Sequence, residues 1–396
     1  MSVILCPYCF EEFGSAEVHW RCENTQCVSP SDGAPGEFDD EYRSYLTEMN
    51  PGRQVDPQRR GHHFELSPEV AAKRKEKNAF CNWCGKKSVL RICPKCHNAL
   101  PHTIDEMDNY IVAVVGAAGV GKSHFIATLL DQIKNAVGYS FEMSLMALTD
   151  ETTGRYKKEF YNRLFVERRV LDKSQAIDRS PLMYRLKRTK RVGPLKLHKS
   201  AMLVFFDNAG ETFNTATEYG VFARYVRHAS AVIFLADPLQ MPGIRERLVQ
   251  SGVTPPPSSA EPADILSRTI NQFEAFGMKR ANGRISVPIA VAFTKVDVLK
   301  DAGILPAGNA TYSAARHVGS FDDAASRLIH DEVASMLVQW EGSEFDMLLQ
   351  HNFSHYRYCA ISALGLAPTA DGKIVGVSPF RAEDPFLWAL NELKFI

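Results

Sequence analysis

Short apolar runs alternate with polar segments over the last two thirds of the chain. Residues 111–115 form an uncharged, β-branched run, which is typical of a strand buried on both faces of a parallel sheet. The apolar spacing of residues 125–130 predicts a helix soon after it. Such alternation is typical of an α/β domain. Further strands are expected at 182–187, 201–206, 231–236, 287–293 and 356–361, and further helices at 155–169 and 263–276.

A glycine-rich loop, Gly-Ala-Ala-Gly-Val-Gly-Lys-Ser at 116–123, joins the first of these strands to its helix. The backbone N–H groups of such a loop surround an anion, a lysine at Lys122 reaches β- and γ-phosphates, and a hydroxyl at Ser123 ligates Mg²⁺. The complete pattern in this context predicts a nucleoside-triphosphate site. The residues expected to contact the nucleotide here are Gly116, Ala117, Ala118, Gly119, Val120, Gly121, Lys122, Ser123 and His124.

The strand at 201–206 leads into Asp207-Asn-Ala-Gly210. An acidic residue directly after a buried strand is where a phosphate-loop enzyme holds the water shell of Mg²⁺, and the N–H of Gly210 can approach a γ-phosphate. We therefore expect Asp207 and Gly210 to contact the nucleotide, with Asp207 also serving the metal ion.

The residues that follow two later strands are suited to bind a guanine base. Thr294, Lys295 and Asp297 follow the strand at 287–293. The Asp297 carboxylate can accept hydrogen bonds from N1–H and the exocyclic amine of guanine, which adenine lacks, and this argues against an ATPase. A backbone N–H of the segment Ser362, Ala363 and Leu364 can donate to the guanine O6.

With these four elements in order, residues 109–396 resemble the Ras-like GTPases, which are related to translation factors. The resemblance implies a mixed, mostly parallel six-stranded sheet with helices on both faces, a three-layer α/β sandwich that binds GTP or GDP with Mg²⁺. Cysteine pairs ahead of Asp-x-Ala-Gly-Glu are also similar to the bacterial double-GTPase proteins. Those are associated with conflict and defence gene clusters, so the resemblance implies an antiviral defence role and a protein effector or second GTPase as partner.

The chain departs from the Ras-like pattern at three places. Glu211 stands where the family carries the glutamine that orients the attacking water, and a carboxylate there can accept a proton. Ala118 replaces a glycine common in relatives. The first-switch hydroxyl that binds Mg²⁺ is expected at Ser174, with Ser180 as the alternative. Lys122 and Glu211 are the expected catalytic residues.

Eight of the nine cysteines come in four close pairs ahead of this domain. Two thiolates in a tight turn supply two corners of a tetrahedral zinc site, so two pairs close one structural site. We expect two Zn²⁺ per chain, with either sequential pairing or pairing of the first with the third and the second with the fourth. The expected ligands are Cys6, Cys9, Cys22, Cys27, Cys81, Cys84, Cys93 and Cys96.

The pattern predicts two parts of the chain. Residues 1–101 form two zinc-ribbon modules with a polar insertion at 28–78, and residues 102–396 form the nucleotide domain with an insertion at 139–170. The chain is 45% hydrophobic with a formal net charge of zero, and it contains no run near the roughly 18 uncharged apolar residues of a membrane span. Without a secretory leader, and with thiols paired as for metal, we expect a cytoplasmic location.

The most concentrated positive charge is expected in a hairpin turn at 188–199. It suggests a polyanionic partner, nucleic acid or an acidic protein, although a solvated hairpin is the plainer interpretation. The alternative to a GTPase switch is a binding module in which the zinc ribbons and this hairpin dock a partner and the nucleotide is structural or slowly turned over. The basic residues are Arg185, Lys187, Arg188, Lys190, Arg191, Lys196 and Lys199.

Overall fold

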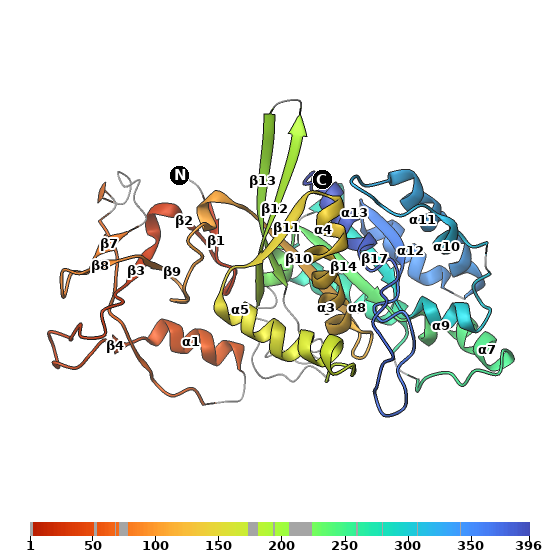
Figure 1. Ribbon diagram of the computed structural model, residues 1–396, viewed down its shortest axis with the longest axis horizontal. Coiled ribbons are helices and arrows are strands. Elements are labelled where there is room, and N and C mark those ends of the chain that lie inside the picture. Colours follow the sequence, from red (N-terminus) through yellow and green to blue (C-terminus); the bar gives the residue numbers. More distant parts are fainter. Residues whose placement is uncertain are drawn as a thin grey trace. The chain divides into compact units, whose positions relative to one another are not determined.

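A computed structural model describes residues 3–50, 54–67, 69–70, 78–172, 181–192, 195–205, 224–258, 260–278, 280–306, 308–340 and 342–396 (Figure 1). The chain divides into two compact units. Unit 1 comprises the described residues of Met1–Asn109, Ala176–Pro181 and Thr215–Tyr225, and unit 2 comprises the rest.

The described residues of unit 1 form short strands and the helix α1 (Asp40–Met49). In a three-stranded sheet β3 (His19–Arg21) lies between β6 (His63–Phe64) and β9 (Leu90–Ile92), antiparallel to both. The helix α1 begins at an N-cap, Asp39, whose Oδ1 accepts the N–H of Tyr42 at 2.9 Å. Three two-stranded sheets complete the unit: β1 (Val3–Leu5) with β2 (Glu12–Gly14), β4 (Glu37–Phe38) with β5 (Arg59–Arg60), and β7 (Ala79–Phe80) with β8 (Lys87–Ser88).

Unit 2 is organised around a seven-stranded sheet with the order β11-β12-β13-β10-β14-β17-β18. The pairs β10/β14, β14/β17 and β17/β18 are parallel, whereas β11/β12 and β12/β13 are antiparallel. The strands are β10 (Asp108–Gly116), β11 (Met143–Ala147), β12 (Leu182–Val192), β13 (Leu195–Phe205), β14 (Ala231–Ala236), β17 (Ile289–Phe293) and β18 (Tyr356–Ala360).

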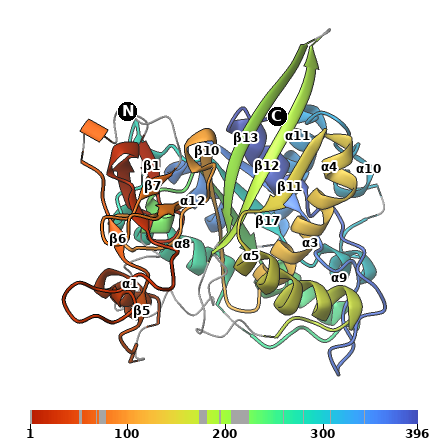
Figure 2. The same ribbon diagram turned by 60° about the vertical axis from the view of Figure 1, so that its left-hand side comes forward.

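Alternate side chains of the parallel strands enter two different core layers. Ile233 and Leu235 of β14 join the cluster formed with the helices α3 (Lys122–Lys134) and α13 (Asp384–Glu392). Phe234, between them, lies 6.1 Å from the ring of Phe345 on α12 (Ser343–Asn352), on the other face. Helices therefore cover both faces, and the predicted α/β sandwich is confirmed (Figure 2). Further helices among the described residues are α4 (Ala136–Ser140), α5 (Asp150–Arg155), a π-helix (Tyr156–Val166), a 3-10 helix (Pro238–Gln240), α7 (Pro242–Gln250), α8 (Pro262–Ala275), α9 (Val296–Asp301), α10 (Ala310–Ser313) and α11 (Asp323–Gln339).

Two expectations about the sheet need correction. The six strands implied by the resemblance become seven, because the insertion supplies β11, whose residues Met143–Ala147 pair with β12 at the sheet edge. The hairpin strands are also longer than predicted: the ladder continues past Lys187, with Thr189 opposite His198 and their side chains 3.0 Å apart. The basic residues therefore lie within two long strands, which project beyond the sheet (Figures 1 and 2).

In the part of the chain that the structure describes, helices long and apolar enough to span a bilayer are absent.

Candidate nucleotide site and cysteine clusters

The glycine-rich loop connects the end of β10 to the start of α3. Gly116 has a φ of +152°, and a Cβ added there would lie 2.5 Å from the carbonyl oxygen of Leu235 on β14, so the close approach of the two strands requires glycine. Gly121 has a φ of +101° and is the N-cap of α3. The turn therefore directs the amino end of a 13-residue helix at the loop, and a helix N-terminus favours anions.

The side chain of Lys122 folds back over this loop. Its Nζ donates to the carbonyl oxygens of Gly116 at 3.0 Å and Ala117 at 2.9 Å, and the residue is 9% exposed. The ammonium group is thus held at the loop that would surround a phosphate. Ser123 follows at the first turn of α3 and is half-buried.

His124 is uncharged and acts as an acceptor. Burial lowers the pKa of His124 to about 4, and the positive charge of Lys295 acts in the same direction. Its Nε2 accepts the backbone N–H of Leu171 at 3.0 Å. His124, which directly follows Ser123 of the phosphate loop, therefore holds the backbone at Leu171.

The base-contact motif begins where β17 ends. Thr294 is buried, and its N–H donates to the carbonyl of Ala236 at 2.9 Å. Lys295 has a φ of +57°, and its Nζ lies 2.6 Å from Oδ2 of Asp237. Among the residues described, the buried Oδ1 of Asp297 meets no hydrogen-bond partner. A buried carboxylate oxygen without a partner is costly, and a ligand donor would satisfy it.

The second base-contact segment lies beside the first. The N–H of Val296 donates to the carbonyl of Ile361 at 3.2 Å, which joins the start of α9 to the end of β18. Ser362 comes next; it is buried, and its Oγ accepts the N–H of Gly365 at 2.8 Å. Asp297 and Ser362 are thereby brought to one edge of the sheet. Ala363 and Leu364 are half-buried there.

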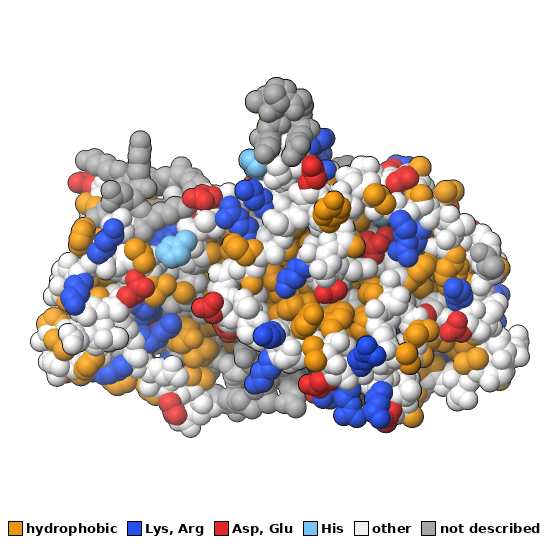
Figure 3. Space-filling model, viewed as in Figure 1, with side chains coloured by type: hydrophobic (Ala, Val, Ile, Leu, Met, Phe, Trp, Pro, Cys, Tyr) orange, Lys and Arg blue, Asp and Glu red, His pale blue; other side chains and the backbone are white. Residues whose placement is uncertain are grey.

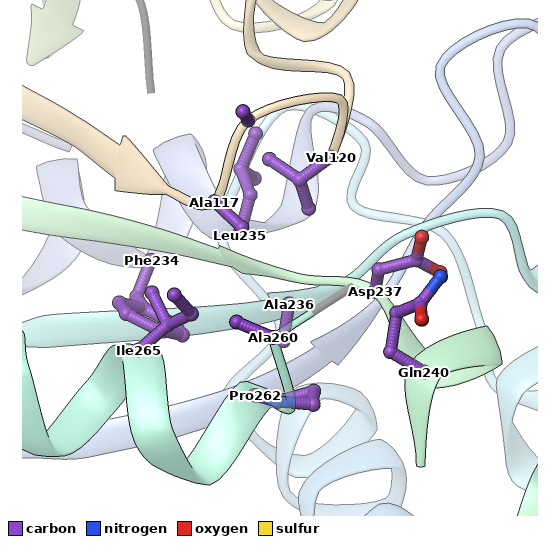
Figure 4. A pocket seen from close by; sticks show the side chains of 11 residues that line it. Ala117, Val120, Phe234, Leu235, Ala236, Asp237, Gln240, Ala260, Pro262 and Ile265 are labelled. Atoms are coloured by element: carbon purple, nitrogen blue, oxygen red, sulfur yellow. The ribbon is translucent and has the colours of Figure 1, made fainter. Parts of the chain in front are cut away.

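A small hollow behind the phosphate loop shows one residue that the sequence analysis missed. Ala117 and Val120 line it on the loop side, and Asp237 and Gln240 lie close to one another at its other end (Figure 4). Asp237 follows β14 directly and pairs with Lys295. An acidic residue at the carboxyl end of a parallel strand was the signal that could have identified it.

Four predicted site residues lie outside the described residues. These are Ser174, Asp207, Gly210 and Glu211. Of the predicted magnesium ligands, the described part of the chain includes Ser123, whose hydroxyl is chemically suited to the ion.

The eight paired cysteines form two groups of four in unit 1. The Sγ atoms lie 3.7 Å apart for Cys6 and Cys96 and 3.8 Å apart for Cys9 and Cys93. In the second group they lie 3.6 Å apart for Cys22 and Cys84 and 3.8 Å apart for Cys27 and Cys81. Four sulfurs placed tetrahedrally at about 2.3 Å from a zinc ion lie about 3.8 Å from one another, so both groups fit this metal.

Each group contains a cysteine whose pKa is lowered. Hydrogen bonding from the Cys6 thiol lowers the pKa of Cys93 well below its usual range, and the backbone N–H of Lys86 lowers the pKa of Cys84 to about 6. The thiolate is the metal-binding form.

The pairing is nested, so both pairings that the sequence analysis considered are wrong. The first pair joins the fourth, and the second joins the third. The cause is the antiparallel ladder of β3 and β9, in which His19 lies opposite Ile92 and Arg21 opposite Leu90. Cys22, after β3, therefore lies at the start of β9, whereas Cys93 lies at its end.

The chain is similar in sequence to known proteins. A family model described as Double-GTPase 2 matches residues 110–341. The chain is 28% identical over 324 residues, 76% of this chain and 80% of the relative, to "Putative ESX-1 scaffolding and assembly protein SaeC" of Mycolicibacterium smegmatis.

Two solved small-GTPase structures also match. The Arl6 (BBS3) small GTPase of Trypanosoma brucei with bound GppNp is 12% identical, with 72% of this chain and 98% of that chain covered and a TM-score of 0.31. The signal recognition particle receptor SRb-GTP/SRX complex of Chaetomium thermophilum is 14% identical, with 66% of this chain and 94% of that chain covered and a TM-score of 0.26.

Proposed function

Because the chain belongs to the Double-GTPase 2 family, we propose that it is a Mg²⁺-dependent GTP-binding switch that hydrolyses GTP slowly without a partner. In such a switch, bound GTP orders two segments of the chain and hydrolysis releases them. The observation that carries this proposal is the buried, unpartnered Oδ1 of Asp297 beside the Ser362 segment.

Asp297 supports guanine as the base. Its ionised carboxylate can only accept hydrogen bonds. Guanine offers two donors to it, N1–H and the exocyclic amine, and adenine lacks this pair of donors. The stem of Lys295 is held next to this position by Asp237, where it can pack over a base. The Ser362, Ala363 and Leu364 segment supplies backbone N–H groups for the guanine O6.

The phosphate side supports binding of a triphosphate. The loop N–H groups, the amino end of α3 and Lys122 all stabilise negative charge. Ser123 is the proposed first ligand of Mg²⁺, with Asp207 and Ser174 as further proposed ligands, and Gly210 as a proposed γ-phosphate contact. When bound, Mg²⁺ neutralises charge that develops on the phosphates.

For hydrolysis, Glu211 is the proposed residue for the attacking water. A carboxylate can take a proton from that water, but its charge opposes the γ-phosphate. An arginine finger from a partner is worth about 10³–10⁵ in rate in this chemistry, so we expect the isolated chain to be slow.

Nucleotide competition tests the base assignment. Asp297→Asn should lose its preference for guanine nucleotides and gain affinity for xanthine nucleotides, whose C2 oxygen needs a donor. Asp301→Asn, at an exposed carboxylate of the same helix, is the matched control and should bind GDP like the wild type. If ATP competes equally with GTP on the wild type, the proposed function is wrong.

We propose that the two cysteine groups each hold one structural Zn²⁺. Structural zinc contributes folding energy directly, so the ions would keep unit 1 folded. Thiolate sites of this kind persist in a reducing compartment, which supports a cytoplasmic location.

Docking of a partner is the second candidate function, and the projecting hairpin favours it. β11 covers β12 only from Tyr184 to Arg188, so the hairpin extends beyond the sheet. Arg188 donates to the backbone carbonyl of Phe395, and Lys199 donates to that of Lys394. These two hairpin cations are therefore less available to a ligand than the others. Lys and Arg side chains are also spread among acidic ones on the face shown in Figure 3 rather than gathered in one patch.

We therefore propose an acidic protein surface as the partner of this hairpin, in keeping with a relative described as a scaffolding and assembly protein. Charge reversal at Lys187 and Lys190 should weaken capture of that partner, whereas reversal at the exposed Lys158 of the π-helix should not. Binding of nucleic acid with a steep salt dependence would favour the other kind of partner.

We also propose a place in a bacterial defence system, which rests only on the resemblance to double-GTPase proteins associated with conflict and defence gene clusters. Loss of protection against phage on inactivation of the gene would support it, and unchanged plating efficiency across a phage panel would remove it.

A further inference from the structure

The chain between the π-helix and the expected first switch runs in an extended arm, residues 168–171. The arm starts with Arg168, whose φ of +54° turns the chain away from the end of the π-helix. It ends with Leu171, which is 8% exposed and packs in the core with α3. Ser174, the proposed switch hydroxyl, follows three positions later in the sequence.

One edge of the arm pairs with a loop at residues 369–375, here named the base loop. The N–H of Val170 donates to the carbonyl of Gly372 at 2.9 Å, and the N–H of Ile374 donates to the carbonyl of Arg168 at 2.9 Å. Arg169 and Lys373 form the antiparallel bridge between these bonds. Ile374 is 6% exposed and joins the same core as Leu171, so the pairing is anchored by apolar contact as well.

The base loop is rooted in the segment proposed to contact guanine. Ser362 and Phe380 exchange two backbone hydrogen bonds of 2.9 and 2.8 Å, and the N–H of Ser378 donates to the carbonyl of Leu364 at 2.9 Å. Beyond these bonds the chain extends to the bottom of Figure 1 as a narrow, dark blue loop that lies beside the end of the π-helix in both views. The loop tip is closed by Thr369 and Lys373, whose backbones are bonded at 2.9 Å.

The arm is held on the phosphate side by His124. The N–H of Leu171 donates to His124 Nε2 at 3.0 Å, and His124 directly follows Ser123. Successive N–H groups of an extended segment point in opposite directions, so Val170 faces the base loop while Leu171 faces His124.

We propose that the arm is a brace connecting the two ends of the nucleotide site, and that His124 and the base loop are positioning elements which slow nucleotide release. The inference rests on the proposed nucleotide binding. Because the arm joins His124 to the base loop, it restrains the phosphate end and the base end from moving apart, and a nucleotide held between them would leave more slowly.

Two pairs of variants test the brace through the release rate of fluorescent GDP and GTP analogues. His124→Leu removes the acceptor, whereas His124→Gln keeps an amide oxygen near the position of Nε2. Val170→Pro removes the backbone N–H that donates to Gly372. Val170→Ala keeps this N–H but also loses side-chain contacts of the valine, so it is the matched control. One buried hydrogen bond predicts about fivefold faster release for His124→Leu and for Val170→Pro, release slower than that of His124→Leu for the rescue variant His124→Gln, and near wild-type release for the control Val170→Ala.

The outcomes are separable. Faster release with an unchanged unfolding temperature supports a positioning role, because a general loss of structure would lower the unfolding temperature while it raised the release rate. Wild-type release rates in His124→Leu and Val170→Pro would overturn the brace and leave the proposed function intact. A wild-type chain that binds no guanine nucleotide would overturn the proposed function, and with it the brace.

Discussion

Lys295 and Asp237 form an ion pair with Nζ and Oδ2 2.6 Å apart, across the ends of two adjacent parallel strands. The carboxylate holds the lysine stem where a base would stack, so it is a positioning residue for the base-contact motif. Asp237→Asn should weaken GDP binding by about fivefold, the effect of losing one charged hydrogen bond at a half-exposed site. Titration calorimetry measures this, with Asp301→Asn as the control. Unchanged affinity would limit Asp237 to a folding role.

Lys122 should be essential for tight GTP binding. Its Nζ already lies within the phosphate loop, where it would exchange two carbonyl partners for phosphate oxygens. Charge-assisted hydrogen bonds are strong, so Lys122→Ala should weaken GTP binding by about a hundredfold or more. Lys158→Ala on the exposed side of the π-helix is the control. Tight GTP binding by Lys122→Ala would place the triphosphate elsewhere.

Glu211 should affect turnover rather than binding. General-base help is worth about 10²–10⁴, so Glu211→Ala should hydrolyse GTP at least about a hundredfold more slowly in a single turnover while binding it near normally. Glu211→Gln restores the residue usual in Ras-like relatives and tests whether orientation alone suffices. An unchanged single-turnover rate in Glu211→Ala would leave this residue as a switch contact only.

The cysteine groups should contain two Zn²⁺ per chain, as elemental analysis of fresh protein can measure. Cys93→Ser should reduce this to one and destabilise unit 1, because a structural site needs four ligands. Cys359→Ser is the control, since Cys359 is a buried cysteine of β18 outside both groups. Zinc-free wild-type protein would remove the ribbon interpretation.

Arg224 should stabilise unit 1. Its Nε donates to the carbonyl of Cys9 at 2.6 Å, and its terminal nitrogen lies 3.0 and 2.9 Å from the carboxylate oxygens of Glu48. Because the side chain is partly exposed, Arg224→Ala should lower the free energy of unfolding by about 1 kcal/mol. Denaturant unfolding followed by zinc release measures this. Arg227→Ala, an exposed arginine three positions later, should have little effect, and equal losses in both variants would refute a specific contact.

Features set by a few neighbouring residues could be predicted from the sequence. The strand at 111–115, the turn at Gly116 and Gly121, and the start of α3 all depend on local glycine and apolar spacing. The mixed, mostly parallel sheet with helices on both faces followed from the motifs and the family they resemble. The edge strand β11 lies in the expected insertion at 139–170, but its place next to β12 depends on pairing that no local pattern records.

Features set by distant pairing could not be predicted. The arm and base loop meet through residues such as Arg168 and Val375, which are 207 positions apart. Neither segment has the alternation or length that marks a strand, because each contributes only one or two bridging bonds. The position of Asp237 after an expected strand was a local signal, but its pairing with Lys295 joins residues 58 positions apart and could not be predicted.

The nested order of the cysteines determines how the chain can be divided. Any fragment that includes both Cys6 and Cys96 also includes the whole inner group, whereas a fragment from Cys22 to Cys84 carries the inner group alone. During synthesis the inner set is complete when Cys84 has emerged from the ribosome, and the outer set twelve residues later. Metal loading of unit 1 would thus proceed from the inside outwards, and both ions could be bound before the later segments of unit 1, residues 176–181 and 215–225, have been made.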